Sequence, residues 1–488
     1  MSLVKRFFSA FATAAIIFPC FVGFAGCKKS DSAITLRVCS WEEYIDEGDR
    51  EEGINPMVDD FTEWFNSSHD YKVKVEYSTF GTNEDLYNSL SLGDVYDLVC
   101  PSDYMIMKLI AEDECLDYSD EFFDGAVEEN YYVNNVSPYI DGIFKANGWD
   151  KKAACYMWGT TGLVYNTDKL KNTKDVSTWK ILLNEAYKRQ VTVKDNVRDA
   201  YFATLGIINS DKLGGEITSA ERSALLNDVD ARTIEEAERV LKKIKENVYS
   251  FETDAGKSDM VTGKVIANYQ WSGDAVYIMD EAENDGTNLW YSVPDECANL
   301  WFDGWLMLKR GISGNAQRRA AAEAFVNFLS RQDNAVRNME YIGYTSAIAG
   351  EEVYEYINDS YAADGAEETL EYDVSYFFGG ECKIIADKAD FGFDGIDINR
   401  GRQLFAQYPP QNVIDRSVIM MDFGDRLSDI NAMWISVRCQ DLKDISPVAI
   451  GVTAAVAAVA VTGVLLYVFR YRIFGEYKPK KGYEKVEK

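Results

Sequence analysis

The sequence of 488 residues has a single histidine, His69, which lies in the polar stretch Asn66-Ser67-Ser68-His69-Asp70. A Ser-His-Asp triad needs a histidine beside its nucleophile, and most zinc sites need several histidines or cysteines. A lone histidine in a polar loop is more often solvated than catalytic. The composition therefore disfavours hydrolases and metalloenzymes of these kinds, and we expect no cofactor.

C-x-x-C spacing is also missing, although the sequence has nine cysteines. This absence excludes a thioredoxin motif and a zinc ribbon. Residues 390–401 resemble a calcium loop, but Gly392 and Gly401 stand at two positions that need oxygen ligands. We therefore expect no bound metal ion.

The N-terminus has the three parts of an export signal. Two basic residues precede an apolar run over residues 7–24, and two small residues then precede Cys27. We expect residues 1–26 to be a signal peptide. The junction resembles the lipobox of bacterial lipoproteins, which implies a lipid on Cys27 and a linker over residues 27–32. An ordinary signal peptide and an uncleaved anchor are the alternatives.

A second membrane signal lies near the C-terminus. Residues 445–469 contain no charged residue. At a rise of about 1.5 Å per residue, this length crosses a hydrocarbon layer of roughly 30 Å. The tail over residues 470–488 is basic, so the positive-inside rule places it in the cytoplasm and the preceding domain outside. We therefore predict one C-terminal transmembrane helix.

Between these two signals the chain is strongly acidic. The formal net charge of the whole sequence is -30, and both ends are basic, so the part between them is more negative still. Such a domain repels nucleic acid and anionic lipids and attracts cations. Solubility alone is the alternative explanation of the charge.

Short strands alternate with helices from residue 33 onward. Residues 34–39, 71–77 and 96–100 have the pattern of strands, and residues 84–92 have that of a helix. This β-α-β rhythm predicts an α/β fold with helices flanking a sheet.

Farther along, residues 233–249 and 316–340 predict helices, and residues 265–271 predict a strand. No repeat or low-complexity linker separates these segments, so we expect interwoven domains. Residues 351–398 are rich in acidic residues and tyrosine and lack a clear period, and we expect an inserted surface region there.

Three short stretches place an aromatic ring near a carboxylate. They are Trp41-Glu42-Glu43-Tyr44, Trp271-Ser272-Gly273-Asp274 and Trp301-Phe302-Asp303-Gly304-Trp305. Aromatic faces attract an ammonium by roughly 0.5–2 kcal/mol each. A carboxylate adds a charge-assisted hydrogen bond to the same ammonium. The stretches suit a cation on an apolar stem, although chance adjacency is common in a chain with 13% aromatic residues.

Further motifs accompany these stretches in a fixed order. They are Tyr77-Ser78-Thr79 with Asn83-Glu84, Tyr96-Asp97-Leu98-Val99 with Pro101-Ser102-Asp103-Tyr104, Trp158-Gly159-Thr160-Thr161-Gly162, Ser177-Thr178-Trp179, Asp195-Asn196-Val197-Arg198-Asp199, Asn327-Phe328-Leu329 and Ile342-Gly343-Tyr344. With these motifs, the chain from about residue 34 to 438 resembles the extracytoplasmic polyamine-binding proteins of ABC importers, the spermidine/putrescine-binding family. Each motif is weak alone, and their common order carries the resemblance.

The resemblance implies a two-lobed periplasmic-binding-protein fold of the α/β class, with interwoven lobes and a ligand site between them. The expected segments are residues 33–158 and 301–350 for the first lobe, 159–300 for the second lobe, 351–444 for the insertion and the rest of the second lobe, 445–469 for the transmembrane helix and 470–488 for the cytoplasmic tail.

The resemblance also implies the site residues. The side chains expected to enclose the methylene chain of the ligand are Trp41, Tyr44, Tyr104, Trp271, Trp301 and Tyr344. Ser102 would offer a hydroxyl and Asp303 a carboxylate to an ammonium. Asp199 stands where many members have glutamate, and Asn196 where spermidine binders have aspartate. Asp274 supplies a carboxylate that is found in putrescine-type members.

The charge of a polyamine gives a reason, independent of the resemblance, to expect carboxylates in the site. A diamine carries two positive charges at neutral pH, and burying them without partners would be prohibitive. Asp199, Asp274 and Asp303 can neutralise a diamine or match a triamine. The resemblance adds that the charge lost at Asn196 and the charge gained at Asp274, relative to spermidine binders, favour putrescine, and that Met420 aligns with a glutamine of spermidine binders.

The leading hypothesis is a membrane-tethered protein that captures putrescine or spermidine and delivers it to an ABC permease, without catalysing a reaction. One alternative is a ligand-sensing receptor domain for a cationic metabolite. Another is a carboxylate-pair glycoside hydrolase, because aromatic and acidic clefts also occur in such enzymes. We expect no nucleic-acid partner.

Overall fold

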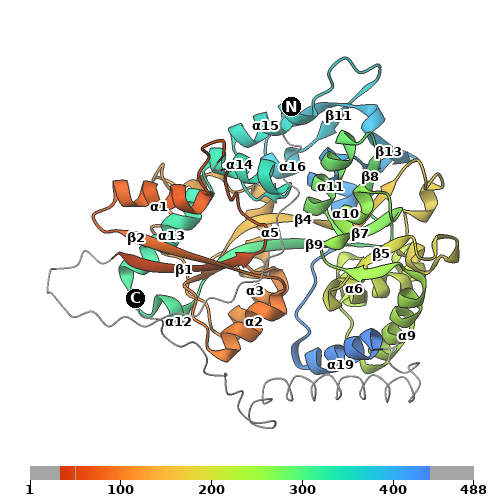
Figure 1. Cartoon of the computed structure of the whole chain (residues 1–488), viewed down its shortest axis with the longest axis horizontal. Helices are drawn as coiled ribbons and strands as arrows, with labels where there is room; N and C mark the ends of the chain where they lie inside the picture. Colours follow the sequence, from red (N-terminus) through yellow and green to blue (C-terminus); the bar gives the residue numbers. More distant parts are fainter. Residues whose placement is uncertain (1–32, 50, 440–488) are drawn as a thin grey trace, which may run out of the picture.

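Two lobes joined by a pair of long strands make up the protein, as Figure 1 shows. The computed structural model describes residues 33–49 and 51–439. Strands β4 (Ala153–Asn166) and β9 (Ala298–Met307) run across the middle of the molecule from one lobe to the other. They pair in antiparallel fashion through the first half of β4. This arrangement confirms the predicted two-lobed α/β fold.

The first lobe contains the predicted β-α-β unit. β1 (Ile34–Trp41) pairs in parallel with β2 (Val73–Phe80) on one side and with β3 (Leu98–Val99) on the other. Helices α1 (Met57–Ser68) and α2 (Asn83–Leu92) connect these strands. The sheet continues from β3 into the antiparallel pair of crossing strands.

Local sequence patterns explain the two helices. α1 buries Met57, Phe61 and Phe65, which are four residues apart and so lie on one helix face. Before α2, the Thr82 hydroxyl accepts a hydrogen bond from a backbone N–H of the first turn, and the helix ends at Gly93 with a φ of 109°. These caps fix where the helix begins and ends.

The second lobe repeats the parallel arrangement. β5 (Val191–Lys194) lies between β6 (Ser250–Glu252) and β7 (Ala267–Trp271) and is parallel to both. β7 pairs with the second half of β4, so the sheets of the two lobes share that strand. Helices α6 (Val197–Ile208) and α11 (Ser272–Asn284) follow β5 and β7 directly.

Other helices and strands complete the two lobes. The helices are α3 (Asp103–Ala111), α4 (Tyr131–Asn135), α5 (Pro138–Asn147), α7 (Ser210–Leu213), α8 (Ser219–Leu226), α9 (Ala231–Asn247), α10 (Ala255–Val261), α12 (Lys309–Ile312), α13 (Ala316–Leu329), α14 (Gln332–Ile342), α15 (Glu351–Tyr361), α16 (Ser375–Phe378), α17 (Gln403–Gln407), α18 (Gln411–Ile414) and α19 (Leu427–Arg438). The strands are β8 (Leu289–Ser292), β10 (Thr345–Ser346), β11 (Thr369–Asp373), β12 (Lys383–Asp387), β13 (Phe391–Asp394), β14 (Asp397–Gly401) and β15 (Ser417–Val418).

The single helix predicted over residues 316–340 is wrong, because two helices cover that range. α13 and α14 are separated by Ser330 and Arg331, and the backbone of Arg331 is extended. The Asn334 amide donates to the Phe328 carbonyl oxygen at 2.8 Å. A side chain therefore satisfies a carbonyl that a continuous helix would have bonded through its backbone.

Residues 351–398 also differ from the expected surface insertion. They include α15, the hairpin of β11 and β12, α16 and β13, and Val353, Ile357 and Ile384 are fully buried in the larger hydrophobic core. The many exposed acidic residues of this region hid its apolar positions in the sequence. Part of the region therefore belongs to the core.

The predicted membrane signals lie outside the described residues. These are the signal peptide over residues 1–26, the lipid site Cys27, the transmembrane helix over residues 445–469 and the tail over residues 470–488. Every helix among the described residues is too short or too polar to span a bilayer. The cysteines of that part form no disulfide.

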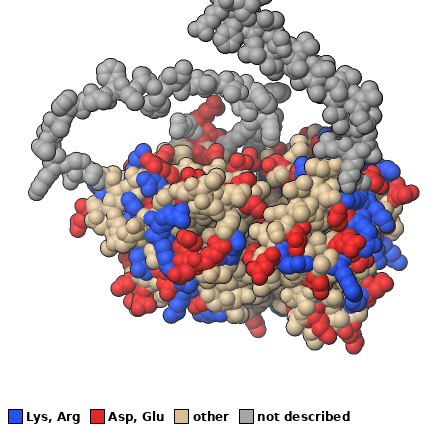
Figure 2. Space-filling view, turned by 90° about the horizontal axis from the view of Figure 1, so that it is seen from below, with Lys and Arg blue, Asp and Glu red and all other residues tan. Residues whose placement is uncertain are grey.

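Charged side chains of both signs are interspersed on the face shown in Figure 2. Uncharged surface separates them along the middle of this face. The acidic excess of the sequence therefore forms no continuous patch on this face.

A substitution at Gly162 of β4 would test how closely the shared strand packs against its neighbours. A Cβ atom added at Gly162 would lie 2.5 Å from the backbone oxygen of Ser292, so Gly162→Ala must displace a strand. We expect the free energy of unfolding to fall by about 1–3 kcal/mol in chemical denaturation.

The matched control is Gly142→Ala in α5, where nothing lies within 4 Å of the added Cβ atom. This substitution should raise the free energy of unfolding by about 0.5–1 kcal/mol, because alanine favours a helix over glycine. Equal effects of the two substitutions would contradict the close packing at β4.

Candidate functional site

The site residues predicted in the first lobe lie at the ends of neighbouring strands. Trp41 is the last residue of β1, and Tyr44 follows shortly after it. Ser102 caps α3, and Tyr104 lies in the first turn of this helix, just after β3. Because β1 and β3 are parallel neighbours, their carboxyl ends meet at one edge of the sheet, where ligands of α/β proteins bind.

The second lobe uses the same arrangement. Asn196 caps α6 after β5, and Asp199 lies in the first turn of α6. Trp271 ends β7, and Asp274 lies in the first turn of α11. Since β5 and β7 are parallel neighbours, these four residues also gather at one edge.

Asp303 of β9 joins the aromatic residues of the first lobe. The Tyr44 hydroxyl donates to Asp303 Oδ2 at 2.6 Å, and Ser102 pairs with Asp303 in a β-bridge. The Tyr344 ring packs edge-on against Tyr44 with ring centres 4.9 Å apart, and it lies 5.7 Å from the Trp301 ring. Three connected aromatic rings therefore lie beside one buried carboxylate.

Tyr344 also reaches the second lobe. Its hydroxyl donates to Asp274 Oδ1 at 3.0 Å. Lys194 Nζ lies 3.3 Å from Asp274 Oδ2 and 3.8 Å from the centre of the Trp271 ring. Lys257 Nζ lies 3.4 Å from Asp274 Oδ1. Predicted residues of both lobes thus meet, and two lysines that were not predicted join them.

Asp199 and Asp303 are buried carboxyl groups with an incomplete set of partners. Asp199 is 2% exposed and Asp303 is 5% exposed. The Oδ1 atom of each has no hydrogen-bond partner among the described residues. Burial raises the pKa of Asp199 to about 7, although Lys194 opposes the shift. Burial raises the pKa of Asp303 to about 6, against the effect of the Ser102 and Tyr44 hydroxyls.

Asp274 is in a different electrostatic environment. Burial acts to raise its pKa, but Lys194 and Lys257 hold the pKa below its ordinary value. The protein itself therefore compensates this charge. Two lysines thus already pair with the carboxylate that was expected to meet a ligand ammonium.

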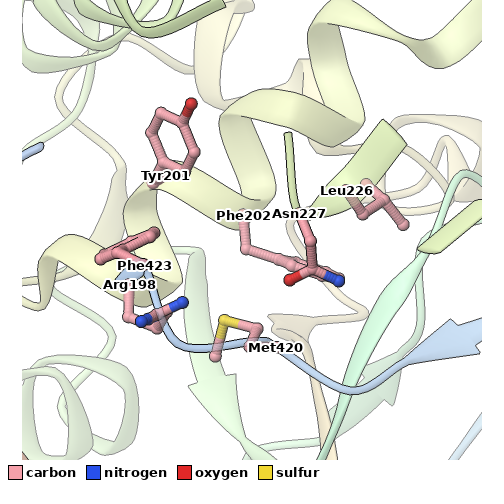
Figure 3. Close-up of a pocket in the computed structure, with 7 residues that line it drawn as sticks. All are labelled: Arg198, Tyr201, Phe202, Leu226, Asn227, Met420 and Phe423. Carbon is pink, nitrogen blue, oxygen red and sulfur yellow. The ribbon is translucent and has the colours of Figure 1, made fainter. Parts of the chain in front are cut away.

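Arg198 links the two lobes beside this site. Its guanidinium lies over the Tyr104 ring at 4.4 Å and over the Phe423 ring at 3.4 Å, and it donates to the Met421 carbonyl oxygen. Figure 3 shows Arg198, Phe423 and Met420 around a small pocket. Met420, which the resemblance aligned with a glutamine of spermidine binders, therefore lines this pocket.

Two predicted site residues, Asn196 and Trp41, contact other parts of the protein itself. Asn196 Oδ1 accepts hydrogen bonds from the backbone N–H groups of Arg198 and Asp199, at 2.8 and 3.4 Å, and so starts α6. The Trp41 ring packs against Phe80 with centres 4.8 Å apart. Asn196 therefore positions Asp199 through the helix it caps.

The segment that resembles a calcium loop has a regular structure. Residues 390–401 contain β13 and β14, which pair as an antiparallel hairpin. Within residues 33–49 and 51–439, no group of three or more His, Cys, Asp or Glu side chains is placed to hold a metal ion.

The sequence interpretation missed Lys194, Lys257 and Arg198. Arg198 stands in the same short motif as Asn196 and Asp199, and that position was the available signal. Lys194 ends a strand, and its side chain is fully buried. Nothing in the sequence showed that these two lysines point toward a carboxylate that follows them in the chain.

Comparison with known proteins identifies the kind of molecule. A family model described as bacterial extracellular solute-binding protein matches residues 57–368. The spermidine/putrescine-binding periplasmic protein of Salmonella typhimurium is 28% identical over 326 residues, which cover 66% of this chain and 80% of that protein. The putrescine-binding periplasmic protein PotF of Escherichia coli is 24% identical over 328 residues, covering 64% and 78%.

Solved structures share the fold. The spermidine/putrescine ABC transporter substrate-binding protein PotD of Streptococcus pneumoniae superposes with a TM-score of 0.55 at 23% identity, over 83% of this chain and 99% of that one. The TpPotD lipoprotein of Treponema pallidum gives a TM-score of 0.56 at 16% identity over the same shares. These likenesses confirm the predicted periplasmic-binding-protein fold.

Asp303→Asn should stabilise the ligand-free protein at high pH. Because burial raises the pKa of Asp303, the native state holds this proton more tightly than the unfolded state does. Native stability therefore falls as the pH rises from about 4 to above about 6. Asparagine carries no charge, so we expect the free energy of unfolding to rise by about 1–3 kcal/mol near pH 8, and by much less near pH 4, in chemical denaturation.

The matched control is Asp364→Asn at an exposed position, which should change stability little at either pH. A loss of stability in Asp303→Asn at both pH values would contradict the prediction, because it would show that the buried carboxylate is stabilising.

Proposed function

The chain belongs to the family of bacterial extracellular solute-binding proteins, and we propose that its solute is a polyamine held between the two lobes. Its curated relatives are named as binding proteins. The chain is a binding protein and not an enzyme. The observation that carries the polyamine proposal is the pair of buried carboxylates, Asp199 and Asp303, whose Oδ1 atoms have no hydrogen-bond partner among the described residues.

A buried carboxylate that lacks a full set of partners destabilises the protein that holds it. Removing such a group from water costs several kcal/mol, and the group responds with a raised pKa. The pKa values of Asp199 and Asp303, raised to about 7 and about 6, are this response. An ammonium at each Oδ1 atom would supply both the opposite charge and the missing hydrogen bond.

Aromatic rings supply surroundings for the methylene groups of such a ligand. Tyr44, Trp301 and Tyr344 form a connected cluster beside Asp303. Trp271 lies near Asp199 and lowers the pKa of that carboxyl. Two buried carboxylates, each with an Oδ1 atom that has no hydrogen-bond partner among the described residues, and an aromatic wall favour an aliphatic diamine, and putrescine is the ligand that we propose.

Delivery of the solute to an ABC permease follows from the same proposal. The PotD relative is named as the substrate-binding protein of an ABC transporter. Release of a buried ligand requires the lobes to separate, and β4 and β9 are the long strands that connect them.

Membrane attachment belongs to the proposal as well. A lipid on Cys27 and a span over residues 445–469 would keep the binding domain outside the cell membrane and the basic tail in the cytoplasm. Both attachments would raise the effective concentration of the domain at the permease.

Calorimetric titration with putrescine tests this function. We expect binding in the micromolar range or tighter for the wild-type protein. Asp303→Ala should weaken the affinity by at least about 30-fold, since truncating one member of a buried charge pair costs about 2–5 kcal/mol.

Asp364→Ala, at an exposed position, serves as the control and should bind putrescine as the wild type does. If the folded wild-type protein gave no heat of binding with putrescine or spermidine, the proposed function would be wrong.

A further inference from the structure

We propose that the side chain of Lys194 fills the subsite formed by Trp271 and Asp274, and that it thereby restricts the site to short diamines. This inference rests on the proposed function, because it concerns which polyamine the site accepts. Lys194 is the last residue of β5, and the chain turns from it into the cap of α6.

Three contacts hold the Lys194 ammonium, and each would equally suit the ammonium of a ligand. Nζ lies 3.8 Å from the centre of the Trp271 ring and 3.3 Å from Asp274 Oδ2. It also donates to the Thr253 carbonyl oxygen at 2.8 Å. An aromatic face, a carboxylate and a carbonyl together satisfy an alkylammonium that has left water. The Lys194 side chain is fully buried, in agreement with this set of partners.

The side chain of lysine closely resembles one arm of a polyamine. A lysine side chain is a stem of four carbons that ends in an ammonium. The aminobutyl arm of spermidine has the same composition. The fold therefore provides covalently, at Trp271 and Asp274, the group that a longer polyamine would have to insert there.

Both oxygens of Asp274 already have partners within the protein. Lys257 Nζ lies 3.4 Å from Oδ1, and the Tyr344 hydroxyl donates to the same atom at 3.0 Å. Lys194 occupies Oδ2. A ligand ammonium brought to this carboxylate would meet two fixed ammonium groups in buried surroundings, where repulsion is weakly screened.

Two carboxylates remain for the ligand, Asp199 and Asp303, each with an Oδ1 atom that has no hydrogen-bond partner among the described residues. The two ammonium groups of a diamine equal these carboxylates in number. A triamine would bring a third charge, and the position best suited to it is already filled by Lys194.

Titration calorimetry with putrescine and spermidine on wild type and Lys194→Met tests the inference. Methionine keeps an unbranched apolar side chain and removes the charge. The wild type should bind putrescine at least about tenfold more tightly than spermidine. In Lys194→Met this preference should fall by at least about tenfold, chiefly because spermidine binds more tightly.

Lys264→Met is the matched control. Lys264 Nζ lies 2.9 Å from Asp259 and 4.7 Å from the centre of the Tyr249 ring, so it has the same kinds of partner away from the site. Its substitution should change the preference by less than about threefold.

An unchanged preference in folded Lys194→Met would overturn the inference and leave polyamine binding intact. A wild type that binds spermidine as tightly as putrescine would also overturn it, and this result decides the question even if Lys194→Met does not fold. A wild type that binds neither amine would instead overturn the proposed function, and the inference with it.

Discussion

Compensation of buried charge between two lobes is the constraint on which this site depends. Asp274 forms ion pairs with Lys194 and Lys257, whereas Asp199 and Asp303 form none in the described part of the chain. In one part of the site the protein's own lysines pair with a carboxylate. In the other part a ligand cation would have to supply the ion pairs. On the proposal made above, ligand selection follows from which carboxylates form no ion pair with the protein's own cations.

The topology creates this constraint. Parallel neighbours in each lobe bring helix starts and loops to one sheet edge, and the shared strand β4 joins the two sheets. Contacts between the lobes, such as Tyr344 with Asp274 and Arg198 with Tyr104, bury the carboxylates. A closed arrangement is therefore most favourable when cations accompany those carboxylates into it.

Local patterns in the sequence predicted much of the fold but only part of the site. The helices expected over residues 84–92 and 233–249 agree with α2 and α9, because their apolar spacing and caps are local signals. The aromatic and acidic motifs identified residues such as Tyr44 and Asp303, which do meet. The state of Asp274 could not be predicted, since Lys194 lies 80 positions away and only the tertiary structure pairs them. For the same reason, the sequence interpretation counted three carboxylates for the ligand, although one of them, Asp274, already pairs with two lysines in the structure.

The most direct measurement is the number of protons released when putrescine binds, obtained by titration calorimetry in buffers of different ionisation enthalpy. With the pKa of Asp199 raised to about 7 and that of Asp303 to about 6, both groups are partly protonated near pH 6.5, and bound ammonium groups lower both pKa values. We expect about one proton to be released per putrescine near pH 6.5 and almost none above about pH 8.5. Tight binding without proton release near pH 6.5 would contradict the account, because the ligand would then not meet the two buried carboxylates.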